Sequence, residues 1–306
     1  MKRFIQKWKH NIQKHWFLFT ELTKRDFKLK YKGTVLGMFW SMLSPLLQLL
    51  VMRLVFTELL GKNIPSYSTY LFSGLIIFNY YAEATKGSIS ALSTNRSIIL
   101  KIKTPKYLFL LSRNVSALIN FLIIIPIYFL FAAFDGISFH FSFFALVYPV
   151  ILLPAFCIGV GLILSAMQVF FNDTLYLYNI FILLLRYLSA VFYDIRGWSP
   201  HIQRLMLLNP VYAFIKYFRL IVIENQIPSF EFHMLLMLYT ACASTSCAKP
   251  MWAKSRPASG RTKSSKPAGT AIFRCCNPSV HPSQFMPILT TVILCVYHSF
   301  RTTLLS

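Results

Sequence analysis

Apolar residues gather in long runs along this chain, and short charged segments separate the runs. Five runs are long enough for the roughly 20 apolar residues that cross a membrane as a helix, and a sixth begins near Phe232 and continues past Tyr239. Helices that are apolar on every side are rare in water-soluble proteins. We therefore predict an all-α membrane protein with six spans. The five complete runs cover residues 35–55, 64–82, 114–134, 136–172 (with flanking residues) and 174–193.

The segment between the fifth and sixth runs is too polar to span a membrane and too apolar for a free loop. Pro200 and Pro210 divide it into two short helical pieces, on which Arg204, Lys216 and Arg219 are expected to face water. Irregular backbone survives at membrane depth only when protein buries it or when it lines a wet cavity. We predict a pair of re-entrant helices on the outer side of the membrane.

Residues 1–32 predict an amphipathic helix that lies in the membrane interface. Its apolar positions recur at steps of three and four residues, and Lys2, Lys7, Lys9 and Lys14 flank them. This pattern is also typical of a plain membrane anchor, so by itself it indicates no further function. The apolar stripe consists of Phe4, Ile5, Trp8, Ile12, Trp16 and Phe19.

The composition agrees with a membrane protein, because only 13% of the residues are charged and the mean hydropathy is +0.56. The net charge of +22 does not indicate a nucleic-acid partner, since the basic residues lie between the apolar runs and no binding motif accompanies them. Residues 1–32 hold ten Lys and Arg and residues 86–113 hold six, against five on the opposite loops. The positive-inside rule places both segments in the cytoplasm. Six spans would then place both termini there.

No catalytic or cofactor-binding group of residues emerges from the sequence. The nine acidic residues form no close pair of the kind that a metal-dependent sugar transferase uses, and the six cysteines form no CxxC zinc pair. No G-x-x-x-x-G-K-[ST] loop is present to hold ATP phosphates. We expect no enzyme activity, metal site or cofactor on this chain, and any ATP and Mg²⁺ would bind a separate ATPase.

Two features stay open to more than one interpretation. Arg186 lies near the middle of the fifth apolar run, where a charge either marks function, snorkels to the interface or faces a polar cavity. Aromatic residues gather around the re-entrant segment, where an interfacial belt is expected. A path for sugars would also use them, because aromatic faces pack against the C–H faces of sugar rings.

The segment RDFKLKYKGTVLGMFWSMLSPLL resembles the start of the membrane subunits of ABC-2 type polysaccharide exporters. The segments YLFSGLIIFNYYAEA, NRSIILKIKTPKYLF, FFNDTLYLYNIF, YLSAVFY and LLNPVYAFIKYFR follow in the order of that family and extend the resemblance over about residues 15–240. The matching positions of the first segment are Arg25, Asp26, Lys28, Lys30, Tyr31, Thr34, Leu36, Gly37, Trp40 and Pro45.

The resemblance implies a membrane domain over residues 1–240, with an interfacial helix at 1–32 and spans from residue 33. It implies a permease homodimer in the bacterial cytoplasmic membrane that works with a separate nucleotide-binding ATPase, in contact with membrane lipids, and exports lipid-linked polysaccharide. The re-entrant helices would form an outer gate, and the cytoplasmic loop would form a coupling helix. The residues expected at the ATPase interface are Arg25, Asp26, Lys30, Tyr31, Lys101, Ile102, Lys103, Thr104 and Pro105. Those expected along the substrate path are Trp40, Tyr80, Tyr81, Tyr187, Phe192, Tyr193 and Trp198.

The sequence leaves two other functions open. An ATP-independent flippase of lipid-linked glycans usually has about twice as many spans and internal repeats, whereas no repeat relates residues 35–134 to residues 140–240. A membrane glycosyltransferase would need acidic residues at the membrane surface, and the acidic residues here do not supply such a group.

The character of the sequence changes near residue 240. The sixth apolar run reaches only about half of a membrane crossing, and no acidic residue follows Glu231. Residues 241–306 are rich in Ser, Pro and Lys and hold five of the six cysteines. We favour a shift of the reading frame that disrupts the sixth span over a genuine flexible extension. We therefore predict that residues 241–306 form an aberrant tail that is separate from the membrane domain.

Overall fold

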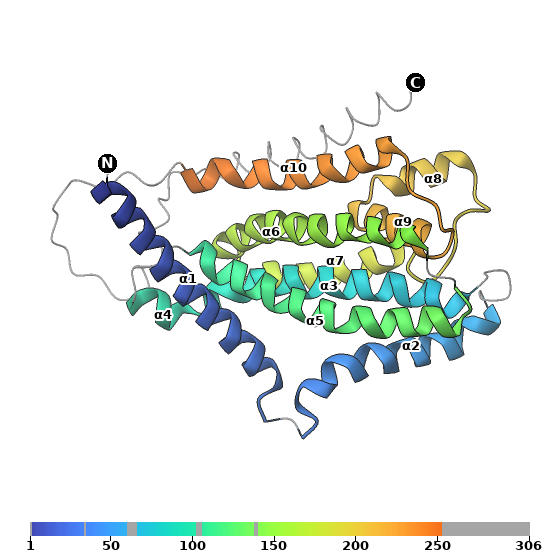
Figure 1. Cartoon of the computed structure of the whole chain (residues 1–306), viewed down its shortest axis with the longest axis horizontal. Helices are drawn as coiled ribbons and strands as arrows, with labels where there is room; N and C mark the ends of the chain where they lie inside the picture. The colour runs from blue at the N-terminus through green and yellow to red at the C-terminus, as the bar shows by residue number, and fades with distance from the viewer. Residues whose placement is uncertain (1, 34, 60–65, 102–105, 138–139, 253–306) are drawn as a thin grey trace.

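The computed structural model describes the backbone of residues 2–33, 35–59, 66–101, 106–137 and 140–252 (Figure 1). Side chains are described over residues 16–245, apart from 34, 38, 56–65, 102–105 and 138–139. Within these residues every regular element is a helix, which confirms the predicted all-α class. The elements are α1 (Lys2–Tyr31), η1 (Gly37–Phe39), α2 (Trp40–Leu59), α3 (Tyr67–Thr94), α4 (Arg96–Lys101), α5 (Tyr107–Phe134), η3 (Phe141–Leu146), α6 (Val147–Phe170), α7 (Thr174–Leu188), α8 (Pro200–Leu207), α9 (Pro210–Val222) and α10 (Phe230–Trp252).

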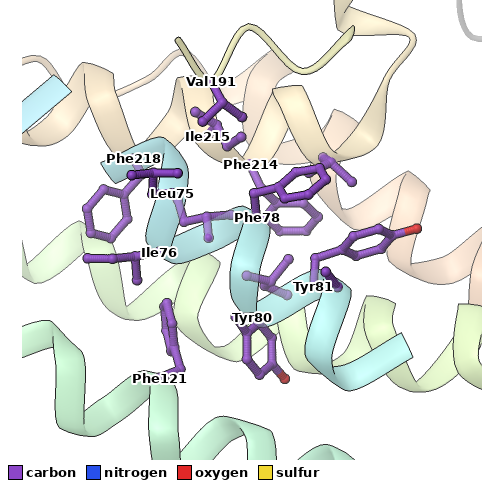
Figure 2. Packing of buried hydrophobic residues seen from close by; sticks show 14 of the residues in the cluster. Leu75, Ile76, Phe78, Tyr80, Tyr81, Phe121, Val191, Phe214, Ile215 and Phe218 are labelled. Carbon is purple, nitrogen blue, oxygen red and sulfur yellow. The ribbon is translucent and has the colours of Figure 1, made fainter. Parts of the chain in front are cut away.

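Helix α3 forms the centre of the bundle (Figure 1). Twenty of its 28 residues are buried, because α2, α5, α6, α7 and α9 all pack against it. Figure 2 shows Phe121 of α5 and Phe214 and Phe218 of α9 packed around the α3 side chains Ile76 and Phe78. A helix that is apolar on all sides is stable only inside such a packed bundle or in lipid.

Two of the described helical segments are long and apolar enough to cross a membrane alone, Tyr107–Phe134 and Phe141–Phe170. The helices Pro200–Leu207 and Pro210–Val222 would add a third span if they count as one, although they meet at 110°. Trp40–Val55 and Thr174–Leu188 are apolar but shorter. The structure therefore does not confirm six spans. A broken helix pair is present where the sequence predicts re-entrant helices, and its depth in the membrane stays a prediction.

The bend between α8 and α9 has a local cause. Pro200 and Pro210 each stand in the first turn of a helix, where the missing N–H leaves no hydrogen bond unmade. Asn209 caps α9 by accepting a hydrogen bond from the backbone N–H of Val211 at 3.0 Å, and its side-chain amide donates to Oγ of Ser189 at 2.9 Å. The bend is thus fixed both by its own sequence and by the end of α7.

The fifth apolar run is helical only over Thr174–Leu188, which corrects the placement of Arg186. This arginine lies in the last turn of α7 and not near the middle of a span. The backbone leaves the helix at Ala190, which has a φ of +46°. The guanidinium lies 5.1 Å from the centre of the Phe78 ring. A cation is favourable in the last turn, because the helix dipole is negative there.

Helix α10 continues past residue 240 as far as Trp252 and packs along α6 (Figure 1). The packing is close: a Cβ built on Gly159 of α6 would lie 2.7 Å from the Cβ of Ala243 and 2.8 Å from its carbonyl carbon. The boundary predicted at residue 240 therefore falls inside a helix. Residues 253–306 lie outside the described residues, so the frame shift and the disrupted sixth span remain predictions.

Replacing Gly159 by valine is expected to push α10 away from α6. Overpacking of a close contact costs about 1–3 kcal/mol, and the atoms in the way belong partly to the Ala243 backbone, which cannot swing aside. Thermal melting of the purified protein in detergent would measure the loss. Gly197→Val is the matched control, because no atom lies within 4 Å of a Cβ built there. Equal melting temperatures for the two variants would show that the helices are not in close contact.

Candidate functional site

The carboxylate of Asp26 anchors α1 on the helix bundle. Asp26 is only 2% exposed, and its oxygens accept hydrogen bonds from the Arg25 guanidinium at 2.6 Å and from Oγ of Ser112 on α5 at 3.1 Å. Nε of Arg113 adds an ion pair at 3.4 Å. A buried carboxylate is tolerated only when partners of this kind compensate for its lost hydration. The cluster therefore joins α1 to the start of α5.

Arg25 extends this cluster to the junction of α3 and α4. Its guanidinium also donates to Oδ1 of Asn95 at 2.5 Å. The Asn95 side chain in turn donates to the carbonyl of Ala91 in α3 at 2.8 Å, and its backbone carbonyl accepts from Ile98 and Ile99 of α4 at 3.1 and 3.0 Å. A displacement of α4 would consequently also shift α1 and α5.

A second polar cluster holds the C-terminal end of α1. Oε1 of Glu83 on α3 accepts from Nζ of Lys30 at 2.8 Å and from the Asn120 amide of α5 at 2.9 Å. The hydroxyl of Tyr31 donates to Oδ1 of Asn120 at 2.7 Å. The four residues of α1 that the sequence assigns to the ATPase interface thus all make contacts inside this chain. Asp26 points into the bundle, and a contact of any of the four with an ATPase stays a prediction.

The short helix α4 has one face packed and one face open. Ile98 and Ile99 pack against a small cluster that includes Leu22 of α1 and Phe109 of α5. Leu100 is 60% exposed, and the neighbouring Arg96 and Lys101 are exposed with it. Lys101 is the last residue of α4, so the described helix precedes most of the predicted coupling segment. The remaining residues assigned to that segment, Ile102, Lys103, Thr104 and Pro105, lie outside the described residues.

The residues predicted along the substrate path fall into two groups. Tyr80, Tyr81 and Phe192 are buried in the core of the chain. The Tyr80 hydroxyl donates to Oδ1 of Asn114 at 3.0 Å, and the Tyr81 ring stacks on Phe156 with 6.1 Å between centroids. In this conformation these three side chains serve packing within one chain.

The other path residues are exposed or half-buried. Trp40, Tyr187 and Trp198 are exposed, and Trp198 stacks on Tyr193 with 5.5 Å between the ring centroids. The Tyr193 hydroxyl donates to the carbonyl of Tyr187 at 2.8 Å. The structure therefore brings Tyr187, in the last turn of α7, together with Tyr193 and Trp198 of the segment that follows, but it does not join all seven predicted residues in one surface.

Arg219 of α9 is buried, so the expectation that it faces water is wrong. It is 6% exposed and donates to the carbonyl oxygens of Ala190 at 2.9 Å, Val191 at 3.0 Å and Tyr70 at 3.2 Å. Its Nε also donates to Oγ of Ser73 at 3.3 Å, and its Cζ lies 3.5 Å from the centre of the Tyr70 ring. Arg219 thus fastens α9 and the segment after α7 to the central helix.

The position of Arg219 in the sequence gives a weak indication that this residue is buried. Arg219 follows Tyr212 and Ile215 at helical steps of three and four residues and precedes Val222 by three, so it shares their face. Those three residues are buried. A basic residue within an apolar stripe is nevertheless ordinary at a membrane surface, because its long side chain can snorkel to water. The spacing of the apolar residues alone does not distinguish a buried arginine from one that snorkels to water.

The Asp26 cluster, the Glu83 cluster and Arg219 all lie in the part of the chain that matches a known protein family. A family model described as ABC-2 type transporter matches residues 18–223, about two thirds of the chain. The chain belongs to this family. The match begins in α1 and ends just after α9, so it covers the predicted membrane domain apart from its N-terminal residues and α10. As an ABC-2 type chain with long apolar helices, the protein is a membrane protein.

Three relatives of this ABC-2 type chain are O-antigen export system permease proteins called RfbA. The protein from Myxococcus xanthus is 27% identical over 220 residues, which cover 70% of this chain and 83% of the relative. Two from Klebsiella pneumoniae are 26% and 25% identical over 213 and 234 residues, which cover 68% and 76% of this chain and 81% and 90% of the relatives. The resemblance to polysaccharide exporter permeases is confirmed. The members of this family are transport subunits and not enzymes.

Proposed function

We propose that this chain is the permease subunit of an ATP-driven exporter that moves lipid-linked O-antigen polysaccharide across the bacterial cytoplasmic membrane. The observation that carries the proposal is the ABC-2 family match over residues 18–223, together with relatives that are O-antigen export permeases. Because the sequence contains no phosphate-binding loop, ATP and Mg²⁺ would bind a separate ATPase subunit.

The contacts of α4 support a mechanical coupling to that ATPase. The open face with Leu100 and Lys101 is available to a cytoplasmic partner, whereas Ile98 and Ile99 hold the helix on the bundle. A push on α4 would pass through Asn95 and Arg25 to Asp26 and hence to α5. In the proposed cycle, closure of the ATPases shifts α1 and α5 together and opens the path.

Exposed apolar faces support an exporter with two permease copies. Leu50 and Leu54 on α2 and Ile180 and Leu184 on α7 are all more than half exposed. Side chains of this kind need lipid or a second protein surface as a partner. The proposed path for the glycan lies between two copies of the chain, and lipid covers what the copies leave open.

The double variant Leu100→Ser and Lys101→Glu tests the coupling surface. ATP-driven export is expected to fall about tenfold, which corresponds to the loss of roughly 1.4 kcal/mol of interaction with the ATPase. The measurement is ATP-dependent uptake of radiolabelled lipid-linked O-antigen into inverted vesicles that hold permease and ATPase. Arg204→Glu is the matched control, because this residue is exposed on α8 at the other end of the bundle. Normal export by the double variant would exclude this face of α4 as the docking site.

The same vesicles separate the proposed function from its alternatives. Transport by the permease alone, with no ATPase and no ATP, would identify an ATP-independent flippase. Transfer of labelled sugar by the purified chain would identify a glycosyltransferase.

A further inference from the structure

Arg186 is a cation that has no anion beside it among the described residues. It lies in the last turn of α7, toward the end of the bundle that is opposite α4 (Figure 1). Its side chain is half-buried, yet it makes no hydrogen bond and no ion pair with any described residue. Protein seals off its Nε atom without supplying an acceptor. A charge in such a place is costly when it is unpaired, so an anion from outside the described chain would stabilise it.

The ring of Phe78 on α3 positions the guanidinium of Arg186. This ring is fully buried, and Cζ of Arg186 lies 5.1 Å from its centre. The two terminal nitrogen atoms of the guanidinium are not sealed off, in contrast to Nε. They belong to the planar fork with which arginine binds two oxygen atoms of a carboxylate or a phosphate at once. The fork is therefore held against the bundle and is free to bind an anion.

The acidic side chains near this end of the bundle already have partners within the chain. Asp194 and Glu224 both pair with Arg196. Asp135 accepts two hydrogen bonds from the first turn of α3, at 2.6 and 3.0 Å. None of these three carboxylates is free to pair with Arg186, either in the same chain or in a second copy.

Exposed aromatic residues place Arg186 near the level of the lipid head groups. Tyr187 and Trp198 are 56% and 44% exposed, and both contact Tyr193, the first through a hydrogen bond and the second through a stacked ring. Tyrosine and tryptophan gather at the interface between membrane and water. Arg186 directly precedes Tyr187 in the chain. Its long side chain can therefore reach the phosphate groups of lipids.

An apolar stripe runs along α7 away from Arg186. It consists of Leu177, Ile180 and Leu184, which follow one another at helical steps of three and four residues and are all more than half exposed. The distance along the helix from Leu177 to Arg186 is about 14 Å at 1.5 Å per residue. This is about half of the hydrocarbon thickness of a membrane, so the stripe is as long as one acyl chain in a single leaflet.

We infer that Arg186 binds the phosphate of a membrane phospholipid, whose acyl chain covers Leu177, Ile180 and Leu184. The phosphate fits the guanidinium fork, and the acyl chain fits the stripe, so one molecule satisfies both features. A free phosphate ion would satisfy the charge and leave the stripe uncovered. Such binding needs only a membrane around the protein, and it is independent of the proposed transport.

Native mass spectrometry of the full-length protein in a mild detergent measures the binding. The probes are dioleoyl phosphatidylglycerol and dioleoylglycerol, which has the same acyl chains but no phosphate. Wild-type protein is expected to retain the phospholipid in preference to dioleoylglycerol. Arg186→Leu is expected to bind the phospholipid about tenfold more weakly, because charge-assisted hydrogen bonds are lost. Arg204→Leu is the matched control, since it removes an exposed arginine of α8 and is expected to bind as wild type does.

Equal binding of the phospholipid by wild type and Arg186→Leu would overturn the inference, as would equal binding of the two probes by wild type. Arg186→Lys keeps the charge but not the fork, so it should bind with intermediate strength, and it tests the site if Arg186→Leu does not fold. Binding of a polyprenyl phosphate in place of the phospholipid would also overturn the inference and would identify an isoprenoid lipid as the occupant. A smaller oligomer for both Arg186→Leu and Glu231→Gln would overturn it too, because it would assign Arg186 to a contact between copies.

Discussion

Arg219→Met is expected to remove most of the folded permease from the membrane. The substitution leaves the carbonyl oxygens of Ala190 and Val191 without their donor, whereas the carbonyl of Tyr70 keeps the Ser73 hydroxyl. Each buried acceptor left unpaired costs about 1–3 kcal/mol, and a folded domain has only about 5–15 kcal/mol in total. Size-exclusion chromatography and thermal melting of the detergent-extracted protein would measure the loss. Arg219→Lys is expected to fail as well, since one ammonium cannot reproduce the planar fork of a guanidinium.

Two further variants make this prediction specific to the buried contacts. Arg204→Met changes an exposed arginine one helix earlier and is expected to melt like wild type. Gly74→Ala is expected to resemble Arg219→Met in direction, because a Cβ there would lie 2.7 Å from Nη2 of Arg219 and 3.2 Å from the Val191 carbonyl oxygen. Normal yield and melting of Arg219→Met would show that the arginine does not hold α9 to α3.

Asp26→Asn is expected to loosen α1 from the bundle and to stop ATP-driven export. The amide keeps the shape of the side chain but leaves the charges of Arg25 and Arg113 without their buried partner. Breaking a fully buried ion pair from one side costs about 3–5 kcal/mol. The loss here is expected to be smaller, because the side chains of Arg25 and Arg113 are 31% and 25% exposed and water hydrates part of their charge. Hydrogen exchange of the amides over residues 16–31 should speed up, and the vesicle assay should show the loss of transport.

Glu21→Gln is the matched control on the same helix. Its partner Lys24 lies 3.2 Å away, and both side chains are more than half exposed. Exposed pairs contribute about 0–1 kcal/mol, so exchange and export should stay near the wild-type values. If Asp26→Asn leaves the exchange of α1 unchanged, the Asp26 cluster does not attach α1 to the bundle.

These two residues differ in how far the sequence could reveal them. Asp26 belongs to the segment that resembles ABC-2 exporters, so its importance is visible in the sequence, but the sequence suggests an external partner. In the structure its partners are Ser112 and Arg113, which lie more than 80 residues away in the chain. Spacing along one helix does not report such contacts. The sequence likewise does not reveal the surroundings of Tyr80 and Tyr81, which it assigns to a substrate path. In the structure neighbouring helices cover both side chains.

The sequence by itself determined the helical class, the order of the apolar segments, the ABC-2 resemblance and the break between Pro200 and Pro210. These features depend on hydropathy and on local proline geometry, which act over a few residues. Only the tertiary structure decided which charged side chains turn inward and where α7 ends. Arg219 shows the reason: it bonds Ala190, 29 residues away, and Ser73, 146 residues away. A cation is stable inside the bundle only when distant segments bring their oxygen atoms to it.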